Sequence, residues 1–266
     1  MLFGRLLPVL VALALCGAAM VAWASGDRDS GARQRLPDLD QHVPYNVQVT
    51  RDRARGGYKL GFSSAVSNIG AGPLIVSGRR PRASVPDMTA NQLVERVGAP
   101  LGVLEDVGTL RYVRSSDHEH WHLLRFERYE LRLPGEDAAL VSDRKTGFCL
   151  GDRYQVRGRR PANKPPRPAY TSRCGLRATE RLALTEGISV GYGDEYDPNL
   201  EGQSLSLRGV PDGRYVLVHR VNVGRRLAES SYRNNAASML IRVTRRAGKP
   251  SVRVLASCPE RARCRV

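Results

Sequence analysis

Lysine, acidic residues and aromatic residues are all scarce in this sequence. Only four of its 266 residues are lysine, and 42 lysines and arginines stand against 26 aspartates and glutamates, a net charge of +16. Hydrophobic residues still make up 41% of the chain. Composition therefore excludes a disordered or collagen-like protein and predicts one large or two small globular domains. The basic surplus is typical of nucleic-acid binders, but the N-terminus and the cysteines argue against that class.

The sequence also lacks a second long apolar run. The one that it has lies near the N-terminus. Arg5 precedes an apolar stretch over residues 6–21, which ends in Ala22-Trp23-Ala24. This pattern predicts a signal peptide over residues 1–24, and residues 25–35 are expected to form a flexible lead-in. An uncleaved membrane anchor is the alternative, because the run nearly reaches the roughly 20 residues of a spanning helix. We expect an exported protein, secreted or in the cell envelope, that does not meet nucleic acid.

Cysteine usage agrees with export. Removal of the signal takes away Cys16 and leaves four cysteines, and an even number in an oxidising compartment predicts two disulfides. We expect the pairs Cys149–Cys174 and Cys258–Cys264, because the second pair is close together and isolated near the C-terminus. Four cysteines allow three pairings, so the alternatives stay open at this point. The cysteine spacing is not that of a zinc site.

Strand-like segments recur along the chain, whereas helical periodicity is scarce. Strand patterns cover residues 58–62, 74–76, 213–223 and 238–243. One short helix is expected over residues 88–98. The sequence predicts a mainly β fold, an antiparallel β-sandwich-like domain over residues 36–246 with long loops and little helix, followed by a tail over residues 247–266.

One stretch, residues 153–173, is crowded with arginine and proline. Proline has no N–H to donate to a sheet, so we expect an exposed loop. The predicted Cys149–Cys174 bridge would close its base. Two interpretations stay open: the loop steers an anionic partner, or it is simply solvated.

Three of the five histidines fall within five residues, in Asp117-His118-Glu119-His120-Trp121-His122. On a strand, alternate side chains share a face, so His118, His120 and His122 would point the same way. The alternation continues downstream, which favours a strand over a helix. Three imidazoles on one face can converge on a metal, and imidazole suits copper, zinc, nickel and iron alike. A solvated polar face is the alternative, and we expect His42 and His219 to bind no metal.

At these residues the sequence resembles the lysyl oxidase family. The histidine segment is similar to that family's copper-binding segment, and further similar segments follow in the same order over about residues 36–245. They are Phe126-Glu127-Arg128-Tyr129-Glu130-Leu131, Lys145-Thr146-Gly147-Phe148-Cys149-Leu150, Gly187-Ile188-Ser189-Val190-Gly191, Asp194-Glu195-Tyr196, Val210 to Leu217 and Glu229 to Asn235. A lone run of alternating histidines is weak evidence, but an ordered set is strong.

The resemblance implies two cofactors. The three histidines would bind Cu(II), and a lysine tyrosylquinone would form from the matching lysine and tyrosine, Lys145 and Tyr196. The scarcity of lysine makes Lys145 informative, because an amine can lose its proton and attack a quinone while a guanidinium stays charged. Tyr192 is the competing tyrosine.

The resemblance also implies an activity, that of a secreted copper-dependent, protein-lysine 6-oxidase-like amine oxidase. Such an enzyme oxidises a primary amine, or a lysine-containing peptide, with molecular oxygen to an aldehyde, and releases ammonia and hydrogen peroxide. A general base must remove the α-proton. Asp194 is the best candidate and Asp197 the second, although both also fit turn formers.

Departures from the family leave two other functions open. A histidine of the animal enzymes is Arg128 here, and the arginine- and proline-rich loop lengthens the interval between Lys145 and Tyr196. The chain could therefore be a non-catalytic exported copper-binding or adhesion β-sandwich protein. Three histidines and a water also describe a zinc hydrolase. The arginines would give a weak, salt-sensitive contact with an anionic cell envelope.

Overall fold

The structure is a computed structural model that describes residues 32–115, 119–142, 147–158, 161–200 and 202–265. Every regular secondary-structure element in this part of the chain is a β-strand, so the prediction of a mainly β, antiparallel fold is confirmed. Among these residues there is no helix with the length and hydrophobicity to cross a membrane. The predicted signal peptide, His118 and Lys145 lie outside the described residues.

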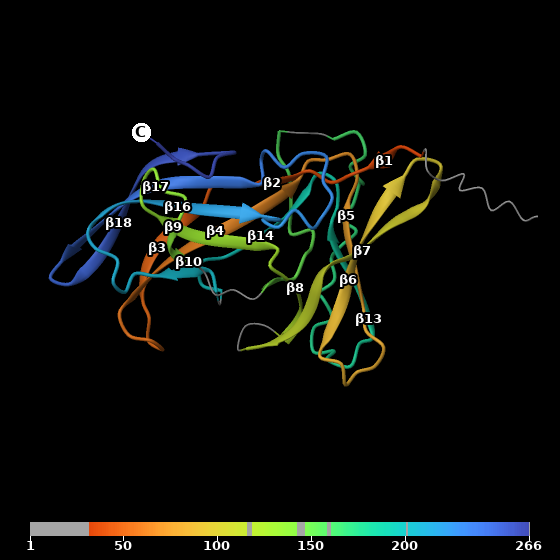
Figure 1. The fold of residues 1–266 in the computed structure, drawn as a ribbon, viewed down its shortest axis with the longest axis horizontal. Coiled ribbons are helices and arrows are strands. Elements are labelled where there is room, and N and C mark those ends of the chain that lie inside the picture. Colours follow the sequence, from red (N-terminus) through yellow and green to blue (C-terminus); the bar gives the residue numbers. More distant parts are fainter. Residues whose placement is uncertain (1–31, 116–118, 143–146, 159–160, 201, 266) are drawn as a thin grey trace, which may run out of the picture. The chain divides into compact units, whose positions relative to one another are not determined.

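The strands form three antiparallel sheets (Figure 1). The first has the order β11 (Gly147–Phe148), β8 (Glu119–Leu124), β7 (Ala99–Arg114), β6 (Asp87–Arg96), β5 (Leu74–Arg79) and β13 (Ala183–Ile188), with β1 (Gln34–Arg35) paired to β6. The second has the order β10 (Ala139–Ser142), β9 (Glu127–Arg132), β16 (Gly213–Val221), β17 (Ala236–Arg246) and β18 (Lys249–Cys258). The third has the order β12 (Tyr154–Gln155), β14 (Tyr192–Tyr196), β4 (Tyr58–Asn68) and β15 (Ser204–Ser206), with β2 (Leu39–Gln41) and β3 (Tyr45–Arg51) also paired to β4.

One cluster of buried hydrophobic side chains joins all three sheets. Trp121 of β8, Tyr129 of β9 and Phe62 of β4 are fully buried within it. The Phe62 and Tyr129 rings meet edge to face with centroids 5.1 Å apart. The β4 strand is buried from Leu60 to Asn68 because it carries partners along both edges. The core therefore lies between the sheets, and side chains from each sheet reach it.

The prediction of a short helix over residues 88–98 is wrong. Residues 87–96 form β6, in which Met88, Ala90, Gln92 and Val94 are buried in alternation. β5 and β7 pair with its two edges. Local periodicity in this segment is weak, and pairing with neighbours far along the chain decides for strand.

Strand pairing extends beyond residues 36–246 at both ends. Residues 249–258 form β18, which pairs with β17 over most of its length, so the segment expected to be a tail belongs to the second sheet. At the other end, Gln34 and Arg35 of the expected lead-in form β1 and pair with β6. Both expected disulfides are confirmed, Cys149–Cys174 with a Cα–Cα distance of 5.7 Å and Cys258–Cys264 with 5.4 Å.

Candidate metal and cofactor site

The histidine segment is a strand, as predicted from residue 119 onward. In β8, His120 is half-buried, His122 is buried, and their rings lie 4.6 Å apart. Their Nε2 atoms are 2.7 Å from each other. Glu119 and Trp121 point to the opposite face, where Glu119 pairs with Arg177 at 2.8 Å. The structure thus brings two of the three predicted ligands together, and His118 lies outside the described residues.

The donor set of this pair fits a metal ion. Neutral imidazole offers one lone pair on a ring nitrogen, and here two Nε2 atoms lie 2.7 Å apart, at hydrogen-bond distance. Among the residues that the structure describes, no group of three His, Cys, Asp or Glu side chains is placed to hold a metal. A complete site therefore needs a further ligand beyond His120 and His122. Imidazole donors alone do not choose between copper and zinc.

Trp121 fixes the strand between the two histidines. Its ring is fully buried, lies under the Arg80 guanidinium at 4.7 Å, and donates from Nε1 to the Ala178 carbonyl at 3.0 Å. Its main-chain N–H donates to the carbonyl of Cys174 at 2.9 Å. A main-chain contact therefore joins the histidine strand to one half of the Cys149–Cys174 disulfide, in addition to its pairing with β7.

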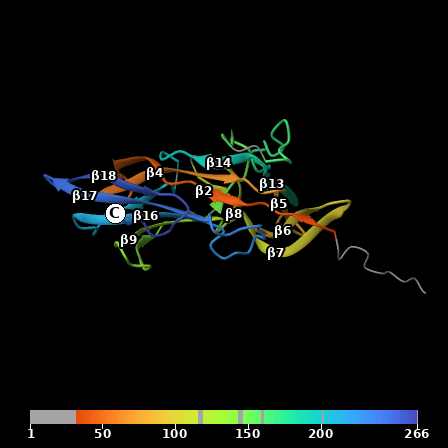
Figure 2. The ribbon, with the colours of Figure 1, turned by 90° about the horizontal axis from the view of Figure 1, so that it is seen from above.

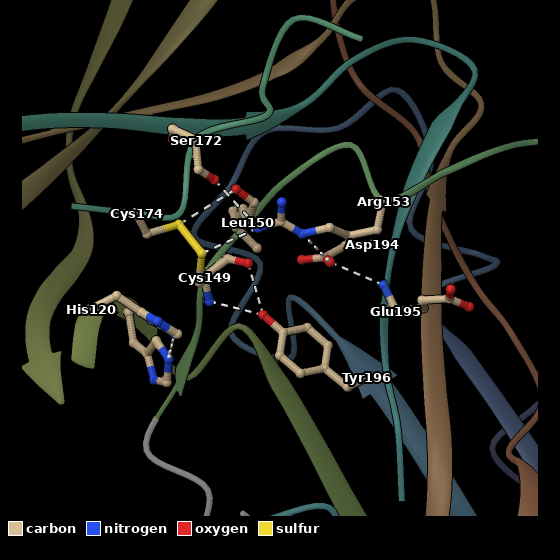
Figure 3. The surroundings of a disulfide bond; sticks show 10 residues. His120, Cys149, Leu150, Arg153, Ser172, Cys174, Asp194, Glu195 and Tyr196 are labelled. Carbon is tan, nitrogen blue, oxygen red and sulfur yellow. Dashed lines mark hydrogen bonds and ion pairs between the residues drawn. A yellow bond between two sulfur atoms is a disulfide. The ribbon is translucent and has the colours of Figure 1, made fainter. Parts of the chain in front are cut away.

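Tyr196 is tied to the other half of that disulfide (Figure 3). It is the last residue of β14 and is buried, with the Phe148 ring edge-on at 4.9 Å. Its hydroxyl donates to the Cys149 carbonyl at 2.7 Å and accepts from the Cys149 N–H at 3.0 Å. Burial, and next the negative charge of Asp194, raise the pKa of Tyr196 well above its usual value. The phenol is therefore held neutral.

The segment that follows Lys145 runs between these two groups. Gly147 and Phe148 form β11 and pair with Leu124 and Leu123 of β8. A Cβ on Gly147 would lie only 2.5 Å from the Leu123 carbonyl oxygen, so this close approach requires glycine. The sequence Gly147-Phe148-Cys149 thus lies beside His122 at its start and holds Tyr196 at its end. Lys145 itself lies outside the described residues.

Asp194 shares a strand face with Tyr196, because the two are separated by one residue of β14. It is buried, and its Oδ1 lies 3.7 Å from Arg153 Nε. Figure 3 shows Asp194 and Tyr196 both directed toward the disulfide, with Glu195 directed away. Asp197, in contrast, is exposed and accepts from the main-chain N–H of Asn199, the role of a turn former.

The competing tyrosine, Tyr192, makes different contacts. Its hydroxyl donates to the Pro165 carbonyl at 3.4 Å, and the Lys164 ammonium lies 5.1 Å from its ring centroid. Both partners belong to the arginine- and proline-rich loop. Tyr192 therefore packs that loop against β14 and has its own lysine neighbour.

Two buried carboxyl groups near Tyr196 were not singled out from the sequence. Glu127 accepts hydrogen bonds from the hydroxyls of Ser64, at 2.7 Å, and Tyr129, at 2.8 Å. Ser64 is the register partner of Tyr196 in the neighbouring strand. Glu186 is completely buried in β13, and burial together with the charge of Asp194 raises its pKa well above the usual value. Glu127 lies in one of the segments that are similar to the family, but nothing in the sequence distinguished either carboxyl group from a surface charge.

The two histidines expected to bind no metal lie elsewhere. His42 forms a 2.7 Å hydrogen bond with Ser67. His219 is fully buried between the rings of Phe62 and Tyr129, at 4.9 and 4.6 Å. Within the described part of the chain neither ring nitrogen of His219 has a hydrogen-bond partner. Arg128, at the position of an animal-enzyme histidine, is exposed and lies 3.8 Å from Glu130.

This geometry defines a class of protein: a β-protein with two neighbouring imidazoles on one strand and a buried tyrosine that is hydrogen-bonded to the main chain of a disulfide-bonded cysteine. A family model described as lysyl oxidase matches residues 109–251, more than half of the chain. The chain therefore belongs to the lysyl oxidase family. The matched region contains the histidine strand, β11, Asp194 and Tyr196.

Curated relatives agree with this family at low identity. Protein-lysine 6-oxidase of Sus scrofa is 27% identical over 133 residues, 48% of this chain and 46% of the relative. The Homo sapiens protein of the same name is also 27% identical over 133 residues, 48% of this chain and 27% of the relative. Human lysyl oxidase homolog 1 is 27% identical over 135 residues, 49% of this chain and 20% of the relative. The match thus spans less than half the length of each of these relatives.

Proposed function

We propose that this protein is a copper-dependent amine oxidase that converts primary amines, including lysine side chains of peptides, to aldehydes. Each turnover would consume one oxygen and one water and release ammonia and hydrogen peroxide. The observation that carries the proposal is the double hydrogen bond between Tyr196 and the main chain of Cys149. This bond, beside the paired imidazoles, joins the candidate cofactor tyrosine to the segment that carries Lys145.

The chain's own residues would have four roles. His118, His120 and His122 would hold copper, and the bound metal would supply redox chemistry with oxygen. Tyr196 and Lys145 would be the two parents of a lysine tyrosylquinone. The main chain of Cys149 would orient the ring through its hydroxyl. Burial of Tyr196 and its packing against Phe148 would exclude water.

Asp194 would act as the general base for the substrate. A carboxylate on the same strand face as Tyr196 is positioned to take the proton from the carbon next to the amine nitrogen. Its ion pair with Arg153, at 3.7 Å, would hold the carboxylate in place. Arg153 would therefore orient Asp194, and Asp197 would remain a turn residue.

Peroxide release tests the activity directly. Purified protein loaded with copper in air should produce hydrogen peroxide from butylamine or from a lysine-containing peptide, and phenylhydrazine should give a coloured adduct. Tyr196→Phe should lose both signals, whereas Tyr192→Phe should keep both. Equal activity of the Tyr196→Phe and parent proteins would overturn the proposal.

A non-catalytic copper-binding protein is the second candidate. The observation that favours it is Arg128, which is exposed and paired with Glu130 at 3.8 Å where the animal enzymes carry a histidine. Full copper occupancy without peroxide release from any primary amine, and without a phenylhydrazine adduct, would support this candidate. A zinc hydrolase would instead retain zinc and give no adduct.

The proposed location is outside the cytoplasm. Two disulfides in a chain that starts with a signal-like segment support export, because such bonds persist in oxidising compartments. The proposed partners are a primary amine or lysine-containing peptide, molecular oxygen and, more weakly, an anionic cell envelope. Nucleic acid is not among them.

A further inference from the structure

Three arginines occupy directly opposed positions on three neighbouring strands of the second sheet. Arg214 of β16 is the register partner of Arg242 of β17, and Arg242 is the register partner of Arg253 of β18. Register partners project from the same face of a sheet, with Cβ atoms about 5 Å apart. We call these three residues the arginine ladder. All three side chains are exposed.

No acidic side chain of the described residues forms an ion pair with the ladder. Strands β16, β17 and β18 contain no aspartate or glutamate. None of the ion pairs and hydrogen bonds of the described residues involves a ladder guanidinium. The nearest acid in sequence, Asp212, is occupied by Arg245 at 2.7 Å. Like charges in directly opposed positions destabilise a sheet, so this arrangement carries a cost that the fold does not offset.

Further cations extend the same face. Two residues beyond the ladder, Thr244 is the register partner of Ser251, and their hydroxyl oxygens lie 3.0 Å apart. Two residues further on, Arg246 is the register partner of Lys249. This end of the face thus presents five cations and two hydroxyls over three strands, which lie side by side in both views (Figures 1 and 2). The opposite face carries buried Tyr215 and Ile241 and belongs to the core.

The remaining part of this face is closed by the end of the chain. Val216, Val218 and Leu240 form a small buried cluster with Cys264, whose disulfide to Cys258 holds the C-terminal segment over them. Leu255 and Ala262 are partly buried against this cluster. The five cations and two hydroxyls themselves include no apolar side chain for insertion into a lipid layer. They also include no aromatic side chain, which proteins that bind single-stranded nucleic acid use to stack bases.

We propose that the arginine ladder is a docking surface for a linear phosphate polymer. Guanidinium groups form bidentate, charge-assisted hydrogen bonds with phosphate, and a row of opposed guanidiniums offers several such bonds to successive phosphates. The bound polymer would remove the repulsion between the arginines. This surface is separate from the residues proposed for amine oxidation and does not depend on that activity.

Binding to labelled long-chain polyphosphate tests the proposal. The variant R214Q/R242Q/R253Q is compared with the control R53Q/R55Q/R167Q, which removes the same charge at exposed positions without opposed arginines. The ladder variant should bind roughly tenfold more weakly and lose much of the salt dependence, while the control should stay within about twofold of the parent protein. The melting temperature of the ladder variant should be unchanged or higher, because repulsion has been removed. R242Q alone should show the same trend.

Three results would overturn the proposal. Equal losses in the ladder and control variants would mean that net charge alone drives binding. Poly-glutamate binding as tight as polyphosphate binding would contradict the phosphate assignment. Ladder-dependent binding to phosphatidylglycerol-containing vesicles, with no binding to polyphosphate, would assign the surface to a lipid layer instead.

Discussion

The Tyr196 hydroxyl is held by both main-chain polar groups of Cys149, the residue whose disulfide partner, Cys174, accepts a hydrogen bond from the N–H of Trp121. One covalent bridge thus links the tyrosine to the strand that carries His120 and His122. The two halves of the candidate site come from different sheets, β8 from the first and β14 from the third. Two connections therefore set their relative position, this bridge and the pairing of β11 with β8.

The Cys149–Cys174 bridge should therefore matter more than the Cys258–Cys264 bridge. The paired cysteines are separated by 25 residues in the first bridge and by 6 in the second. Loop entropy predicts that the first bridge stabilises the fold by about 3.5 kcal/mol and the second by about 2 kcal/mol. In denaturant unfolding, C149S/C174S should lose more stability than C258S/C264S. Only the first variant should also lose the phenylhydrazine signal under conditions where it is folded. Loss of that signal in both variants would contradict the linking role.

Removal of either described histidine should reduce metal binding. H122N and H120N each delete one imidazole donor, so metal content after copper loading and dialysis should fall to a small fraction of that of the parent protein. H42N is the matched control, because His42 bonds to Ser67 away from this pair, and it should keep full metal content. Undiminished copper in H122N would show that the metal binds elsewhere.

Substitution of Asp194 and of Asp197, the two aspartates that flank Tyr196, should have clearly different effects on catalysis. Asp194 is buried beside Arg153, whereas Asp197 is exposed in a turn. D194N should lower kcat for amine oxidation by roughly 10²- to 10⁴-fold, the usual contribution of a general base, with intact cofactor absorbance. D197N should change kcat little. The reverse ranking would move the base to Asp197.

His219 should make folding sensitive to acid. Burial lowers its pKa to about 3, while in the unfolded chain the value is about 6.5. Between these two pKa values the unfolded state binds a proton and the folded state does not. His219 therefore leaves the free energy of unfolding undiminished above pH 6.5 and lowers it as the pH falls toward 3. H219F should lose less stability than the parent protein between pH 7 and pH 4. Parallel stability curves for the two proteins would contradict the assignment.

Short-range patterns predicted the parts of the molecule that depend on neighbours in sequence. Alternation indicated the β8 strand and the shared direction of His120 and His122, and cysteine arithmetic indicated both disulfides. The strand at residues 87–96 and the incorporation of residues 249–258 into a sheet depend on pairing with distant strands, which no local pattern contains. Glu127 and Glu186 escaped notice for the same reason: they meet Ser64 and Asp194 only after the sheets assemble.

Cross-link mapping tests the central claim most directly. After aerobic copper loading, digestion and mass spectrometry should reveal one peptide in which Lys145 is joined to Tyr196. K164R should retain it, because Lys164 only lies near the Tyr192 ring, whereas K145R should abolish it. Separate, unmodified Lys145 and Tyr196 peptides from fully copper-loaded protein, or a Lys164–Tyr192 link, would contradict the account.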